Sequence, residues 1–156
     1  MKIIEKYKMG FDAWGLILFF FIMIPNLIWF TISAPNDILR VESATPIIDT
    51  VGSIVQAVMV FALCAIINIE CKRPMQKRFR AGVIAAALIY FVGWIFYYNG
   101  VISPVIVLDL LIAPCLAFIL FAAGRKNIFA LVLAIMFSIC HFIYGFVNFA
   151  IYIIPL

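Results

Sequence analysis

An aspartate and a histidine inside long apolar runs are the side chains of this sequence best suited to chemistry. Asp109 interrupts the run Val105–Leu111, and His141 lies in the middle of the last such run. An ionised side chain at the centre of a bilayer costs about 2.5–3.5 kcal/mol on insertion scales, so such residues face protein or water and have a partner. A carboxylate can orient a histidine, and histidine titrates near neutral pH. The pair therefore indicates a ligand-binding or proton-coupling centre.

Membrane-spanning helices must position these two residues. The chain has 156 residues, of which 68% are hydrophobic and 12% charged, and a soluble domain could not cover its surface with so few polar groups. Each apolar run is near or above the roughly 20 residues that cross a bilayer as a helix, and none shows the alternation of a barrel strand. We expect an all-α integral membrane protein, a five-transmembrane-helix bundle that forms one transmembrane domain over residues 1–156. The expected spans are about 12–33, 48–69, 81–98, 101–123 and 128–154.

The basic residues predict how these spans are oriented. Of the eleven Lys and Arg residues, all except Arg40 lie in the short segments 2–8, 72–80 and 125–126. Short positively charged loops stay in the cytoplasm, so we expect a cytoplasmic N-terminus and an extracytoplasmic C-terminus, in a multi-pass protein of the cell membrane. The net charge of +4 lies beside the membrane, where anionic lipid headgroups are the nearer partner. Nucleic acid is not an expected partner.

The orientation allows the depths of Asp109 and His141 to be compared. A helix rises about 1.5 Å per residue, which places Asp109 roughly 12 Å below the outer boundary and His141 roughly 20 Å above the inner one. In a core about 30 Å thick these levels nearly coincide. Gly124–Asn127 predicts a tight helical hairpin, with a helix-stopping glycine and an N-capping asparagine, that sets the two residues side by side.

Further polar residues fall at the same level on other spans. Asn26 is the counterpart on the first span, and on the second Gln56 shares a helical face with Ser53 and Asp49. On the fifth span, two polar residues follow His141 at helical spacing. We therefore expect a polar chamber in the outer half of the bundle. The residues expected to line it are Asp109, His141, Asn26, Gln56, Tyr144 and Asn148.

Two prolines support a chamber at this level. Pro25 and Pro114 each free a backbone carbonyl, next to Asn26 and Asp109 respectively. Freed backbone at membrane depth is tolerated where protein or a water-filled cavity satisfies it. The aromatic residues near span ends are expected to form the interfacial belt: Trp14, Trp29, Tyr97, Tyr98 and Tyr152. The small residues Gly82, Ala86 and Gly93 predict a packing face that serves either an intramolecular contact or a dimer.

Other chemistry finds little support in the sequence. The four cysteines show no CxxC spacing, and no zinc-protease, hydrolase or phosphate-loop motif occurs. We expect no catalytic residue, no metal and no cofactor, and the balance is against an enzyme. The expected partners are membrane lipids, a small polar ligand, and a homo-oligomer or larger membrane complex.

Three functions stay open on these observations. The first is a small inner-membrane protein that binds or transports a small polar solute or ion through the chamber. The second is a non-transporting accessory or immunity protein that works by helix contacts with another membrane protein, where the intramembrane polar residues are structural. The third is a membrane-embedded lipid-modifying enzyme that uses Asp109 and His141 as an acid–base pair.

Overall fold

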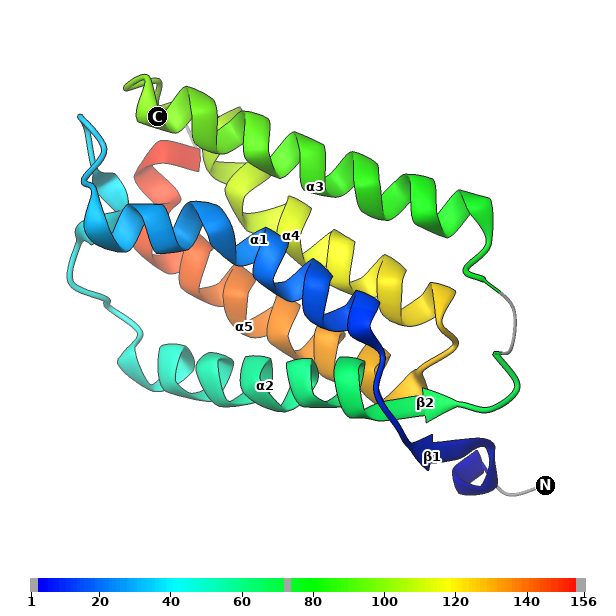
Figure 1. Ribbon diagram of the computed structural model, residues 1–156. Coiled ribbons are helices and arrows are strands. Elements are labelled where there is room, and N and C mark those ends of the chain that lie inside the picture. The colour runs from blue at the N-terminus through cyan, green and yellow to red at the C-terminus, as the bar shows by residue number, and fades with distance from the viewer. Residues whose placement is uncertain (1–2, 72–73, 154–156) are drawn as a thin grey trace.

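A computed structural model describes residues 3–71 and 74–153, and this part of the chain forms five long helices (Figure 1). Each is long and apolar enough to cross a membrane, so the predicted all-α bundle of five such helices is confirmed. Two short 3-10 turns, Ile3–Lys6 and Ile38–Arg40, precede α1 and α2. The helices are α1 (Ala13–Thr31), α2 (Pro46–Ala65), α3 (Lys77–Tyr98), α4 (Pro104–Gly124) and α5 (Ile128–Ile153).

Four of the helices form a curved layer in the order α3, α4, α5, α2, because each packs most extensively on its neighbours in this order. Helix α1 lies across this layer and touches α2, α3 and α4 less extensively (Figure 1). Consecutive helices run in opposite directions, so α1, α3 and α5 begin at one end of the bundle. We call it the basic end, because it holds the described cations Lys6, Lys8, Lys77, Arg78, Arg80, Arg125 and Lys126. The segment 32–45 between α1 and α2 covers the other end, the loop end.

The second span ends earlier than its hydropathy predicts. Helix α2 stops at Ala65, and the residues that follow form strand β2 (Ile66–Asn68), which pairs antiparallel with β1 (Tyr7–Met9). The apolar isoleucines at 66, 67 and 69 extend the hydrophobic run, but β-branched side chains also fit a strand. The pairing satisfies backbone groups that would otherwise be left free where the helix ends.

The predicted hairpin between α4 and α5 is present, and its N-capping residue is Asn127 as expected. Asn127 caps α5, since its Oδ1 accepts from the Ala130 N–H at 3.1 Å, and its Nδ2 donates to two carbonyls of the α2–β2 segment. The left-handed backbone position belongs to Lys126, with φ of 52°. At Gly124 a Cβ would press on Met75 and Phe79, so this glycine permits close packing at the end of α4.

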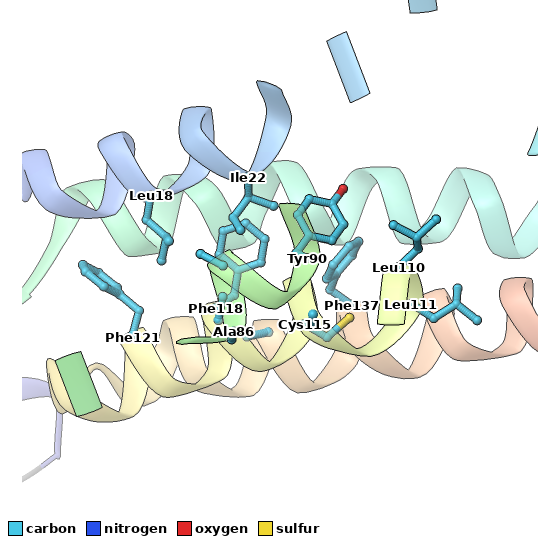
Figure 2. Packing of buried hydrophobic residues seen from close by; sticks show 14 of the residues in the cluster. Leu18, Ile22, Ala86, Tyr90, Leu110, Leu111, Cys115, Phe118, Phe121 and Phe137 are labelled. Carbon is cyan, nitrogen blue, oxygen red and sulfur yellow. The ribbon is translucent and has the colours of Figure 1, made fainter. Parts of the chain in front are cut away.

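The core nearest the basic end is tightly closed. Met59, Ala117 and Ala122 have no exposed surface, and Phe118 is 1% exposed. Figure 2 shows Leu18 and Ile22 projecting from α1 toward the side chains of α4. Close packing of this kind excludes water. The bundle is therefore closed at this level. A small cavity of about 100 Å³ lies at the basic end beside Asp12 and Arg125, and a larger one lies in the half toward the loop end.

Candidate ligand-binding chamber

The half of the bundle toward the loop end encloses a cavity of about 410 Å³, to which all five helices contribute. A volume of this size falls in the range of small-molecule sites, which are mostly apolar with a few placed polar groups. We call this cavity the chamber. Its polar and aromatic lining includes Asn26, Trp29, Asp49, Ser53, Gln56, Tyr90, Trp94, Tyr97, His141 and Tyr144.

Four of the six residues predicted for the chamber line it. They come from three different helices: Asn26 from α1, Gln56 from α2, and His141 and Tyr144 from α5. The half-buried Gln56 makes no side-chain hydrogen bond to any residue that the structure describes. Its amide therefore remains available to a ligand, with both a donor and an acceptor to offer.

Asn26 is held by Tyr90, which was not among the residues predicted to line the chamber. Asn26 Nδ2 donates to the Tyr90 hydroxyl at 2.7 Å and contacts the Ile22 carbonyl at 3.4 Å. Tyr90 is 3% exposed, and its ring meets Trp94 edge-on at 6.3 Å between centroids. Since the Tyr90 oxygen already accepts from Asn26, its own proton can be donated elsewhere.

The indole of Trp94 lies against the same tyrosine. Trp94 is 5% exposed, and its Nε1 lies beside the Tyr90 hydroxyl, where it has no surface open to the chamber. The Tyr90 hydroxyl is therefore the group of this pair that has a proton left to donate. Trp94 was not among the residues predicted to line the chamber.

His141 lies where Pro114 interrupts the hydrogen bonds of α4. Its imidazole lies beside the main chain of Leu110, whose carbonyl has no helical donor because Pro114 occupies the position four residues later. The ring also stacks on Phe137, with centroids 5.3 Å apart and an interplanar angle of 21°. Pro114 was predicted to free a carbonyl next to Asp109. The freed carbonyl of Leu110 lies beside His141 instead.

Asp109 points away from the chamber, contrary to the expected pairing with His141. Its carboxylate packs against α3 at Gly93, where a Cβ would overlap Oδ2. Among the described residues no ion pair joins Asp109 to His141. Depth counting placed the two at one level, but neighbouring residues on a helix differ by about 100° in direction.

Gly82 and Gly93 both face α4, so the small-residue face serves an intramolecular contact.

Asn148 fastens the loop end instead of lining the chamber. Its Oδ1 accepts from the Ala44 N–H at 2.8 Å, and its Nδ2 donates to Thr45 Oγ1 at 3.1 Å and to the Tyr144 carbonyl at 2.8 Å. These bonds tie α5 to the segment that leads into α2. Asn148 follows His141 at helical spacing, but its hydrogen bonds are made to the loop.

Asp37, in the segment 32–45 that covers the loop end, ties this segment to α1 and α3. Asp37 accepts from Trp29 Nε1 at 2.9 Å, from the Tyr97 hydroxyl at 2.8 Å and from Arg40 Nε at 2.7 Å. The pKa of Asp37 is lowered below its ordinary value. Partial burial alone would raise it, but these hydrogen bonds and one from the Ala34 N–H stabilise the ionised carboxylate more than burial destabilises it. Trp29 and Tyr97, which were predicted for the interfacial belt, are therefore both held in this network.

The chemistry of the chamber is suited to noncovalent binding. Its lining combines aromatic rings with amide, hydroxyl and imidazole groups, and in the described residues no three His, Cys, Asp or Glu side chains gather as a metal site would require. Comparison with protein-family models, curated proteins and solved structures finds no match to this chain. Any functional conclusion therefore depends on the geometry of the chamber itself.

Proposed function

We propose that this chain is a multi-pass protein of the cell membrane, with its basic end in the cytoplasm, that binds a small ligand in the chamber. The observation that supports binding most directly is the convergence of Asn26, Gln56 and His141, from three helices, on one cavity of about 410 Å³. If these groups served only to hold the helices together, each would be paired with another group of the protein. Instead, the Gln56 side-chain amide has no hydrogen-bond partner in the described chain.

The charge distribution supports the orientation. The described cations gather at the basic end, where a cytoplasmic leaflet would attract them. Arg40 is the exception at the loop end, and it is paired with Asp37 and lies over the Trp29 ring at 4.8 Å. Single cysteines at Lys8 and Glu42, in a background with the native cysteines removed, test this topology. An impermeant maleimide added to intact cells should label only the cysteine at 42.

Transport of the bound ligand across the membrane would be a further step beyond binding. The packed core around Phe118 and Met59 separates the chamber from the basic end in this conformation. Movement of a solute across the membrane would require this seal to open, and the proline-interrupted helices α1 and α4 are the elements suited to bend. Binding needs no such change, so binding is the step that the geometry supports best.

Native mass spectrometry of the protein released from mild detergent tests ligand binding. The wild type should retain a small molecule, and Gln56→Leu and His141→Ala should each lower its affinity about three- to tenfold, because each removes a hydrogen-bonding group. Thr50→Val is the matched control, since Thr50 is exposed on α2 and its hydroxyl bonds only its own helix. Flux of the retained molecule into proteoliposomes then distinguishes transport from binding.

The same measurement distinguishes the rival functions. A protein that carries a stoichiometric partner and an empty chamber would be an accessory or immunity protein, contrary to the proposal. Loss of ligand in Asp109→Asn, with normal binding in Gln56→Leu and His141→Ala, would move the site to the contact between α3 and α4. Equal retention in all variants would leave the chamber without a binding role.

A further inference from the structure

The chamber reaches the surface of the bundle between α1 and α2. Two residues that line it are also exposed: Phe30 of α1, at 64%, and Ser53 of α2. At the basic end α1 and α2 are in close contact, since a Cβ at Gly15 would lie 2.8 Å from the Leu63 carbonyl oxygen. They diverge toward the loop end (Figure 1). In a membrane-spanning bundle, this opening faces lipid.

The loop end of the chamber is covered. Leu39 lines the chamber from the loop, and its N–H donates to the Tyr97 hydroxyl at 3.2 Å. Asn36 Nδ2 donates to the Gly100 carbonyl at 3.2 Å, which holds the same segment on the turn after α3. On the other side, Asn148 holds Ala44 and Thr45. The covering segment is thus fastened to α3 and to α5, whereas no residue within 3–71 and 74–153 is seen to fasten a similar cover over the opening beside Phe30.

The donors around the chamber define the chemistry of its ligand. The Gln56 amide has no partner in the described chain, and the Tyr90 hydroxyl has a proton to donate. An acceptor oxygen on the ligand satisfies either donor. Among the described residues that line the chamber none is Lys or Arg, His141 is the one group there that could carry a positive charge, and Asp49 supplies a carboxylate at the loop end. The described lining thus holds no permanent counter-ion for an anion, and a neutral acceptor is favoured.

The remaining surface of the chamber favours rings. Aromatic side chains from four helices line it, including Trp29, Phe118 and Tyr144, and offset or edge-on contacts with a second ring would be favourable. A cavity of about 150 Å³ accepts a single benzene ring. The chamber, at about 410 Å³, has room for a molecule of two rings.

We infer that the ligand is a neutral aromatic or quinoid molecule with a carbonyl or hydroxyl oxygen, and that it enters from the bilayer through the opening between Phe30 and Ser53. This inference rests on the proposed binding function and specifies both the class of ligand and its route. The oxygen accepts a hydrogen bond from the Tyr90 hydroxyl, and the rings lie among the aromatic side chains. A molecule of this kind partitions into lipid, which suits an opening that faces the membrane.

Benzophenone is a suitable probe, because it is a neutral two-ring ketone that forms covalent adducts on irradiation. The protein is reconstituted in nanodiscs, mixed with vesicles that contain benzophenone, and irradiated briefly at increasing times. Adducts are mapped by mass spectrometry at Met23, which lines the chamber, and at Met136, which is 47% exposed on α5. Met23 should be labelled well above Met136. Tyr90→Phe keeps the ring and removes the hydroxyl, and should lower the affinity measured at Met23 about three- to tenfold.

The route is tested by filling the opening. Ser53→Trp should abolish Met23 labelling at the earliest times, while Val58→Trp, at an exposed position on the same helix, should leave it unchanged. Unchanged early labelling in Ser53→Trp would overturn entry between α1 and α2. Labelling of Met23 by the water-soluble benzophenone-4-carboxylate alone would overturn the ligand class and leave binding in the chamber standing. If neither probe labels Met23 above Met136, the binding function fails as well.

Discussion

The Tyr97 hydroxyl donates a hydrogen bond to Asp37 Oδ1 at 2.8 Å and accepts one from the Leu39 N–H at 3.2 Å. Tyr97 is only 1% exposed, although it lies in the last turn of α3. One buried hydroxyl thus connects the end of a helix with two residues of the α1–α2 segment. Because Leu39 lines the chamber, the same hydroxyl fixes the position of the cover above it.

Tyr97→Phe should therefore weaken the fold at the loop end. A hydrogen bond to a charged acceptor contributes about 1.5–3 kcal/mol, and we expect the free energy of unfolding to fall by that amount. Tyr98→Phe is the control, because the Tyr98 hydroxyl donates to the neutral Ile32 carbonyl at 2.9 Å, a bond worth about 0.5–1.5 kcal/mol. Unfolding in mixed micelles with increasing denaturing detergent measures both losses. A larger loss in Tyr98→Phe would contradict the role given to Asp37.

The stability of the cover should depend on acid pH through Asp37. Its pKa is lowered in the folded protein, so the folded state favours the ionised carboxylate. The resulting stability is fully present above the ordinary aspartate pKa of about 3.9, and it is lost as pH falls through the lower folded pKa. Asp37→Asn should remove this part of the pH dependence. Hydrogen exchange of the segment 36–45, followed from pH 6 to about pH 3, measures the effect in both proteins, and parallel profiles would contradict it.

Gly93 should be intolerant of a side chain because of Asp109. A Cβ at position 93 would overlap the Asp109 carboxylate, and overpacking of this kind costs about 1–3 kcal/mol. If the overlap is the cause, Asp109→Ala should restore part of the stability of Gly93→Ala. A double-mutant cycle on unfolding free energies gives this coupling directly. Strictly additive losses would show that Gly93→Ala acts through another neighbour.

Periodic hydropathy and helix-end chemistry are the parts of this fold that the sequence predicted well. Five long apolar runs correspond to five helices, and Asn127 caps α5 as its place after Gly124 indicated. Depth comparison also brought Asn26, Gln56 and His141 to one level, where the chamber lies. These features depend on local sequence or on distance along a helix axis, and both can be read from residue numbers.

Rotation about a helix axis could not be read in the same way. Asp109 and Leu110 differ by one position, yet Asp109 faces Gly93 and Leu110 lies beside His141. Helix α4 is apolar on nearly every side, so its periodicity contained little information on which face meets which neighbour. The Asp37 network was missed for a different reason. It joins residues far apart in sequence, and Tyr97 in a terminal helical turn resembles an interfacial tyrosine until its partner in the loop is known.

At the basic end, Asp12 should show two separable contributions to stability. It caps α1 by accepting from the Trp14 N–H at 3.1 Å, and it pairs with Arg125 Nε at 2.5 Å, linking α1 to the segment after α4. Asp12→Asn preserves a good N-cap and removes the charge, so we expect a loss of about 1 kcal/mol that shrinks in Arg125→Gln. Asp12→Ala removes the cap as well and should cost about 1 kcal/mol more in either background. Unfolding free energies of the four combinations test this, and equal losses for Asn and Ala would show that the cap contributes nothing.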